Sequence, residues 1–137
     1  MSFELRDHTA DVAVAASAPT LDALFAAVAD GLAAAGCDAI PEAGGDRFAV
    51  DVDAESVEAL LFDYLDELIF ERDVRAVLPV DNEASVRRSD GAWALSGSAR
   101  GVPLDAVDAR EVKAVTYSEM RVEETDDGWE AYVVFDV

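Results

Sequence analysis

The chain has 137 residues, the length of one ordinary domain, and 52% of them are hydrophobic, which excludes a disordered tail. It has no run of about eighteen apolar residues, so a membrane-spanning helix is not expected. Asp and Glu number 30 against 10 Lys and Arg, giving a formal net charge of −20. Such a field repels phosphate backbones, so strong direct binding to nucleic acid is not expected.

The excess of acidic residues has two interpretations. One is a dedicated acidic surface for a basic partner or for cations, and the other is the composition of a halophilic protein. The acidic residues are scattered along the whole chain rather than gathered in one tail, which favours the halophilic interpretation. At about 1 M salt the Debye length is only about 3 Å, so the self-repulsion would be screened.

Two features favour a cytoplasmic location. The first twelve residues, "MSFELRDHTADV", have no basic segment followed by an apolar one, so we do not expect a signal peptide. Cys37 is the single cysteine and cannot form an internal disulfide, which suits a reducing compartment.

The first half of the chain predicts strands and two helices. Residues 2–5 and 11–17 are typical of strands, and Thr20 is a good N-cap for a helix that stops near Gly36. Residues 47–53 alternate like a strand. Asp53 can cap a second helix with a wide apolar stripe, which indicates deep burial.

The second half predicts strands and hairpins. A strand is expected over 74–80, and hairpin turns over 89–91 and 126–128. This order predicts an α+β fold in one domain spanning residues 1–137. We expect two layers, a mostly antiparallel sheet with two main helices on one face.

Familiar catalytic motifs are absent. The sequence has no glycine-rich phosphate loop, no HExxH and no cysteine pair for zinc. A nucleophilic pair of His8 with Cys37 is disfavoured, because Cys37 follows a helix stop and lone cysteines usually only pack. We therefore assign no catalytic residue and expect that the protein is not an enzyme.

Two acidic residues stand at opposite ends of the chain. Asp11 begins a strand of small apolar residues, and Asp136 closes an apolar strand just before Val137. A carboxylate there is costly to bury unless it is compensated, and a hard cation would compensate it. Oxygens of Asp11, Asp136 and Val137 would suit Ca²⁺, Mg²⁺ or Mn²⁺. His8 would be either a fourth ligand or a residue that contacts one of the ligands. The alternative is that both carboxylates are simply solvated strand ends.

The chain resembles the archease family in segments that follow one another in order over nearly its whole length. The opening HTAD and the closing Phe-Asp-aliphatic end are the most specific of them. The segments are "HTADV" (8–12), "TLDALFAAVADGL" (20–32), "ESVEALLFDYLDELIFERD" (55–73), "REVKAVTYSEM" (110–120) and "VVFDV" (133–137).

The resemblance implies a small cytosolic accessory protein with an α+β fold that acts with the GTP-dependent RNA ligase of tRNA splicing. It implies that the protein promotes guanylylation of that ligase, supports its turnover and broadens its use of nucleotides. It also implies a bound divalent metal, for which Ca²⁺ is the first choice. The ligands would be the Asp of the HTAD motif, the Asp near the C-terminal end and the main chain of the residue that follows that second Asp. By position these are Asp11, Asp136 and Val137.

One position departs from the family pattern. Many members have a His after the Thr-Tyr of "VKAVTY", where this chain has Ser118, so no role of that His carries over. Lys113, the single lysine, lies in the same segment. It would either touch a nucleotide phosphate or the ligase, or merely pair with a neighbouring carboxylate.

Two other functions compete with a ligase activator. The acidic oxygens and His8 could activate a water in a stand-alone divalent-metal-dependent hydrolase or nuclease. Against it, we find no second base and no phosphate-binding Arg cluster near the motif. The third possibility is a plain acidic protein-binding domain whose carboxylates only solvate it.

The charge excess generates a prediction about salt. Transfer from molar salt to dilute buffer should loosen or unfold the protein, because the repulsion among its 30 acidic residues is then unscreened. Circular dichroism measures the change, and identical spectra in the two solutions would contradict the halophilic interpretation.

Overall fold

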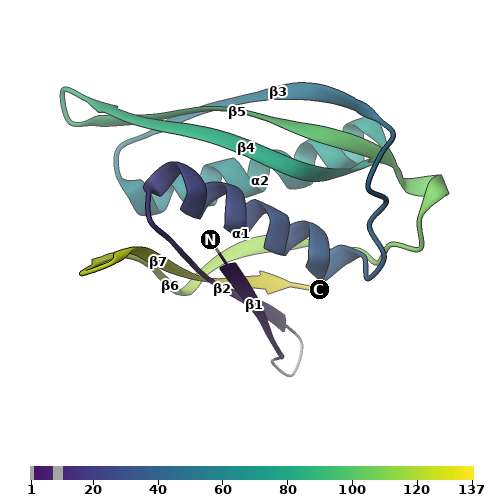
Figure 1. Ribbon diagram of the computed structural model, residues 1–137, viewed down its shortest axis with the longest axis horizontal. Helices are drawn as coiled ribbons and strands as arrows, with labels where there is room; N and C mark the ends of the chain where they lie inside the picture. The colour runs from purple at the N-terminus through teal and green to yellow at the C-terminus, as the bar shows by residue number, and fades with distance from the viewer. Residues whose placement is uncertain (1, 8–10) are drawn as a thin grey trace.

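The structure, a computed structural model, describes residues 2–7 and 11–137 (Figure 1). Over these residues the chain forms seven strands, two α-helices and one short 3-10 helix. The elements are β1 (Ser2–Asp7), β2 (Asp11–Ala18), α1 (Leu21–Gly36), β3 (Asp46–Ala54), α2 (Val57–Arg75), β4 (Val77–Ser89), β5 (Ala92–Pro103), η1 (Leu104–Ala106), β6 (Ala114–Thr125) and β7 (Gly128–Asp136).

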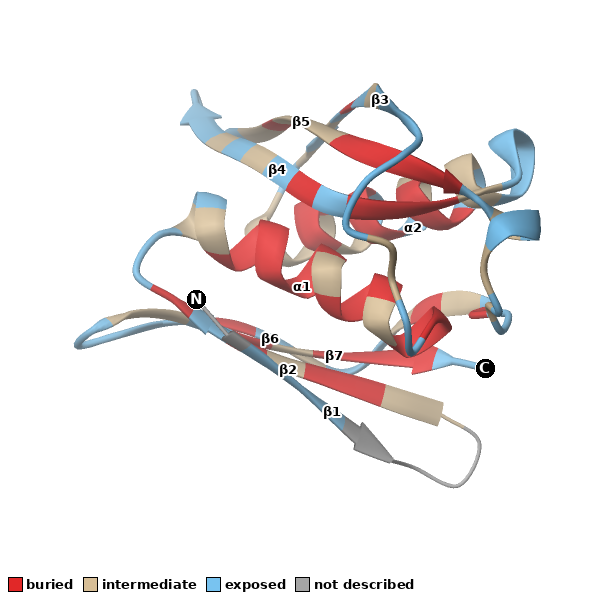
Figure 2. Ribbon diagram, turned by 45° about the vertical axis from the view of Figure 1, so that its right-hand side comes forward, coloured by how far each residue is buried: buried red, intermediate tan, exposed pale blue. Residues whose placement is uncertain are grey.

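The strands form two antiparallel sheets with the helices between them (Figures 1 and 2). One sheet has the order β1-β2-β7-β6 and the other β3-β5-β4. The α+β class, the antiparallel pairing and the two helices are thus confirmed. The expected single sheet is in fact two, so each sheet has one face covered by helices. The alternating pattern marks the buried face of a strand but does not reveal which sheet the strand joins.

Hydroxyl side chains cap both helices. The Thr20 Oγ1 accepts the Ala23 N–H at 3.2 Å, as predicted for α1. For α2 the predicted cap, Asp53, is wrong. The strand β3 continues to Ala54, and the Ser56 Oγ accepts the Ala59 N–H at 3.1 Å.

The two predicted hairpins are present, but the start of β4 differs from the prediction. Helix α2 continues through Arg75, so the expected strand at 74–80 begins only at Val77. It then runs on to Ser89 with a bulge between Val80 and Glu83. The bulge explains why the predicted strand ends at residue 80, since an extra residue interrupts the alternation there.

One hydrophobic cluster joins both sheets to both helices. Phe25 of α1 and Tyr64 of α2 stack with ring centroids 6.2 Å apart. Phe135 of β7 and Leu95 of β5, from different sheets, belong to the same cluster and are almost fully buried. Packing through the helices therefore fixes the position of one sheet relative to the other. Neither helix of the described chain combines the length and the hydropathy that crossing a membrane requires.

Two carboxylates of α1 cover the edge strand β4. The Asp22 Oδ1 accepts the Val86 N–H at 2.7 Å. The Asp30 Oδ1 accepts both the backbone N–H of Asn82, at 3.1 Å, and its side-chain amide, at 2.9 Å. These bonds occupy backbone donors that an edge strand would otherwise offer to another chain.

Asp30 generates a prediction about stability. Burial raises its pKa, and the hydrogen bonds from Asn82 offset part of that rise. An amide oxygen accepts the same bonds without a charge, so Asp30→Asn should be at least as stable as the wild type near pH 7. Asp30→Ala leaves the buried Asn82 donors unpaired and should lose about 1–3 kcal/mol.

The pH dependence has a definite sign. The pKa of Asp30 in the folded protein is raised above 3.8, the ordinary value that it keeps in the unfolded chain. The stability of the wild type that comes from protonated Asp30 is therefore fully present below pH 3.8 and is lost as the pH rises through the folded pKa. The stability of Asp30→Asn relative to the wild type should therefore increase from about pH 4 to about pH 7. Denaturant unfolding in molar salt measures this difference, and a difference independent of pH would contradict the assignment.

Candidate metal site at the paired ends of β2 and β7

The strands β2 and β7 bring Asp11 and Asp136 directly opposite each other. Their antiparallel register runs from the Asp11–Asp136 pair to the Ala18–Trp129 pair. Opposed residues of an antiparallel pair share a face, with Cβ atoms about 4.5–5.5 Å apart. The two carboxylates predicted from opposite ends of the sequence therefore lie within reach of one ion.

The pair lies on the face of the sheet that the helices leave open. The next residues on the two strands, Val12 and Phe135, contact the core, and Phe135 is fully buried. Because side chains alternate, Asp11 and Asp136 lie on the other face. Asp11 is half-buried and Asp136 is exposed, near the C-terminus marked in Figure 1.

The connection into β6 fixes the end of β7. The Lys113 N–H donates to the Asp136 carbonyl at 2.8 Å, and Ala114 pairs with Asp136 on the side away from β2. Three residues earlier, the Arg110 N–H donates to the Gly36 carbonyl at 2.7 Å. The segment 110–113 thus ties the end of α1 to the end of β7 and holds Asp136 between two neighbours.

The donor set consists of oxygens. Val137 follows Asp136 directly and is 38% exposed, so its main-chain oxygens are the nearest further donors along the chain. Among the described residues no group of three or more His, Cys, Asp and Glu side chains could hold a metal, so the two carboxylates are a pair without a third such side chain. Opposed like charges destabilise a strand pair, and a cation between them would remove that cost. The residues present therefore fit a hard divalent cation such as Ca²⁺.

The other sequence-predicted residues have different positions. His8 lies outside the described residues. Lys113 is exposed and approaches the pair through its main chain, and within residues 2–7 and 11–137 its ammonium forms no ion pair. Ser118 is exposed, in the irregular part of β6. Cys37 is 2% exposed and its Sγ donates to the Ala39 carbonyl at 3.5 Å, so it packs rather than reacts.

Sequence reasoning missed the anchoring role of Arg110. Besides its backbone bond to α1, its guanidinium donates to the Asp38 carboxylate at 2.8 Å, and this bond lowers the pKa of Asp38. The two residues are 72 positions apart. No local pattern signals such a contact, because only the folded chain brings the end of α1 to the segment before β6.

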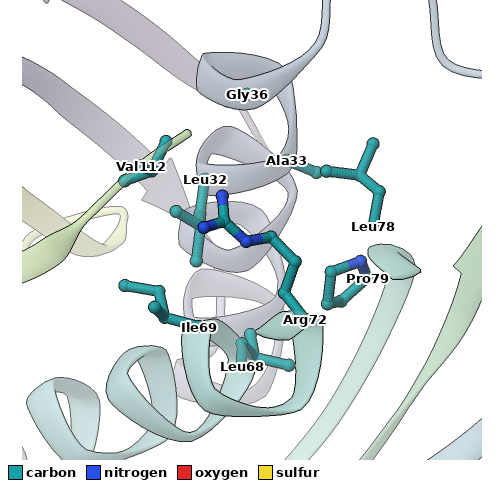
Figure 3. A pocket seen from close by; sticks show the side chains of 9 residues that line it. All are labelled: Leu32, Ala33, Gly36, Leu68, Ile69, Arg72, Leu78, Pro79 and Val112. Atoms are coloured by element: carbon teal, nitrogen blue, oxygen red, sulfur yellow. The ribbon is translucent and has the colours of Figure 1, made fainter. Parts of the chain in front are cut away.

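A small apolar pocket lies near this end of the molecule, between the C-terminal halves of α1 and α2 (Figure 3). Its lining is Leu32, Ala33, Gly36, Leu68, Ile69, Arg72, Leu78, Pro79 and Val112. The Arg72 side chain, 11% exposed, lies across it and pairs with Asp73 at 3.2 Å. Apart from Arg72 the lining carries no reactive group. The pocket does show that Val112, just before Lys113, lies beside the last turns of α2.

Comparisons with known proteins agree with these features. The Archease protein family (MTH1598/TM1083) matches residues 3–137. A protein archease from Thermococcus gammatolerans is 34% identical over 139 residues, covering 98% of each chain. The solution structure of Methanobacterium thermoautotrophicum protein 1598 superposes with a TM-score of 0.85 at 28% identity, covering 98% of each chain.

A second solved structure shows the same fold at lower similarity. The crystal structure of a Thermotoga maritima protein described as an archease, possible chaperone, has a TM-score of 0.63 at 20% identity. It covers 96% of this chain and 94% of its own. None of these names describes an enzyme, in keeping with the absence of an assigned catalytic residue. With the family matched from residue 3 to residue 137, this chain belongs to the archease family.

Proposed function

We propose that this protein is a non-catalytic, metal-binding accessory protein that activates the GTP-dependent RNA ligase of tRNA splicing in the cytoplasm. It would promote guanylylation of the ligase and support its turnover. The observation that carries the proposal is the direct opposition of Asp11 and Asp136 in a chain that belongs to the archease family.

The openness of the site supports a role shared with a partner. Ca²⁺ takes six to eight oxygen ligands, and two carboxylates with the Val137 main chain leave positions unfilled. Asp136 and Val137 are exposed at a strand end, so a partner protein and a nucleotide triphosphate can approach the remaining positions.

The same openness argues against a stand-alone hydrolase. Catalytic sites usually enclose most of their substrate in a concave pocket lined by apolar groups. The Asp11–Asp136 pair instead lies at the end of an open sheet face, where a substrate would stay surrounded by water. A plain acidic binding domain would explain the charge, and Glu123 opposite Glu130 shows that acids can share a register position without a proposed ion, but it would not explain why the Asp11–Asp136 pair lies in the two most specific segments of the family resemblance.

The site generates a prediction about metal affinity. Asp11→Asn and Asp136→Asn each replace a carboxylate by an isosteric amide. Each should weaken Ca²⁺ binding by more than the roughly 10–100-fold that loss of an outer-shell partner costs. Isothermal titration with Ca²⁺ and Mn²⁺ in molar salt measures the affinity. Asp51→Asn, an exposed strand carboxylate of β3, is the matched control and should bind like the wild type.

Extension of the chain beyond Val137 separates its two kinds of oxygen. A Gly-Ser extension removes the α-carboxylate and keeps the carbonyl. Weaker binding would identify the carboxylate as the ligand, and unchanged binding the carbonyl. If the two Asn variants bind Ca²⁺ as tightly as Asp51→Asn does, the protein has no metal site at this position.

The proposed activity generates a second prediction. Addition of the wild-type protein should raise the rate and the turnover of ligase guanylylation. Asp11→Asn and Asp136→Asn should lose this stimulation, because each removes one oxygen and the negative charge that would hold the ion between protein and ligase. The assay follows transfer of radiolabelled GMP to the ligase, with Asp51→Asn again as the control.

Two outcomes would count against the proposed function. Absence of stimulation by the wild type would reject the role in ligase activation. Metal-dependent turnover of RNA or nucleotides by the isolated protein would favour the hydrolase instead. Unchanged far-UV circular dichroism of both variants shows that a lost effect does not come from unfolding.

A further inference from the structure

The outward side of α2 exposes large apolar side chains. Phe70 and Val74 are 56% and 65% exposed, and their four-residue spacing places them on the same side of the helix. Two turns before Phe70, Phe62 stacks on Tyr117 of β6, with ring centroids 4.1 Å apart and planes 5° from parallel. We name Phe62, Phe70, Val74 and Tyr117 the α2 ridge. From Phe62 to Val74 it extends about 18 Å along the helix axis.

The structure of β6 keeps Tyr117 on this ridge. The register of β6 with β7 shifts between Thr116 and Arg121, and Glu119 has a positive φ of 58°. The strand therefore leaves its regular ladder just after Thr116, and Tyr117, 55% exposed, packs on Phe62. A bulged edge of this kind resists pairing with another strand, so side chains rather than backbone are available for contact here.

Charged residues, mostly acidic, flank the apolar side chains, and the two arginines of the last turn, Arg72 and Arg75, pair with Asp73 and Glu71. Asp63, Asp66 and Asp73 are exposed on α2, and Asp66 is four residues from both Phe62 and Phe70. Apolar groups gathered within a polar rim mark interaction sites on soluble proteins, and aromatic anchors dominate the binding energy of such sites. The α2 ridge has both features, a charged rim and aromatic side chains that can serve as anchors.

We propose that the α2 ridge is the docking surface for a partner protein that presents apolar side chains within a basic surface. This inference rests on the proposed function, under which the partner is the RNA ligase.

The charge of the ridge selects this class of occupant. Nucleic acid and anionic lipid carry negative charge and are repelled by Asp63 and Asp66. A second copy of this chain carries the same formal charge of −20, and a two-fold contact through the ridge would oppose identical acids. A basic protein surface is complementary to the acids, while its apolar groups cover the ridge.

Salt explains why the apolar part is needed. In molar salt the Debye length falls to about 3 Å, so surface charges act only at contact distance. They can then discriminate between partners that are already in contact, but they attract a partner only weakly. Burial of apolar surface does not depend on that attraction and supplies the affinity under these conditions. Phe70 and Val74 are therefore the side chains from which we expect the largest losses.

A short series of contacts connects the ridge with the segment that holds the end of β7. Ile69, the neighbour of Phe70, lines the same pocket as Val112 (Figure 3). The next residue, Lys113, donates its N–H to the Asp136 carbonyl. A partner seated on the C-terminal half of α2 is therefore close to the segment 110–113, which holds the end of β7 from the helix side of the sheet.

The test compares Phe70→Glu/Val74→Glu with the wild type. The double variant should need an about 30-fold or higher concentration for half-maximal stimulation of ligase guanylylation, the effect of losing one strong anchor. Added glutamates increase the attraction to a basic partner, so a weaker interaction reports lost apolar contact. Leu5→Glu, on β1 and 41% exposed in the wild type, is the matched control and should behave like the wild type.

Further measurements separate the possible failures. Ca²⁺ affinity and circular dichroism of the double variant should equal those of the wild type, since neither the carboxylates nor the core is altered. If the double variant reaches half-maximal stimulation of the ligase at the same concentration as the wild type, the ridge is not the docking surface, while the proposed function stands. A wild type that neither binds nor stimulates the ligase overturns both.

Two more outcomes test the nature of the occupant. Asp66→Lys should weaken binding to the ligase, and more strongly as the salt is lowered toward the limit of folding. An unaffected Asp66→Lys overturns the basic character of the partner surface. Light scattering should show the same mass for wild type and double variant. A wild-type dimer that the double variant loses would make the ridge a self-interface and overturn the proposal.

Discussion

The pairing of β2 with β7 is the constraint on which the rest of this structure depends. It joins segments from near the two ends of the chain, in a register that runs from Asp11–Asp136 to Ala18–Trp129. A slip by one residue would turn Phe135 from the core to the open face and Asp136 from the open face to the core. The burial of Phe135 therefore holds the register, and the register holds the two carboxylates opposite each other. Apolar packing on one face of the sheet thus determines the polar arrangement on the other.

The same kind of residue has three different surroundings in this very acidic chain. Asp22 and Asp30 face backbone donors of β4, which makes them caps for an edge strand. Asp81 faces the guanidinium of Arg100 at 2.7 Å, at the bulge of the same strand. The Asp11–Asp136 pair differs from both, because each carboxylate faces another negative charge. Of these three arrangements only the last places two like charges opposite each other without a hydrogen-bond donor between them in the described contacts, and for that reason it is the one that points to a cation.

Local sequence signals predicted local structure, and contacts between distant residues limited the rest. Thr20 was identifiable as a cap, because a hydroxyl before an apolar stripe is a local pattern. The start of α2 was placed three residues early, since Asp53 and Ser56 are both acceptable caps and only the length of β3 decides between them. Arg100 gave no signal at all, although it binds the carbonyls of the loop before β3 from 56 and 59 positions away. The position of Asp136 at the end of an apolar strand was visible in the sequence, whereas its opposition to Asp11 needed either the family resemblance or the fold.

An open metal site and a separate docking surface complement each other physically. Two carboxylates and a main-chain oxygen offer little area, and much of their attraction for a partner is lost in high salt. Such a site can share an ion but cannot by itself hold a protein. The α2 ridge offers the opposite properties, apolar area without coordinating groups, and Val112 and Lys113 connect its helix to the end of β7. In this division the ridge supplies affinity for the partner protein, and the ends of β2 and β7 supply the oxygens that would hold a shared ion. Substitutions in the two regions should then affect different quantities, the half-saturating concentration for the ridge and the maximal stimulation for the carboxylates.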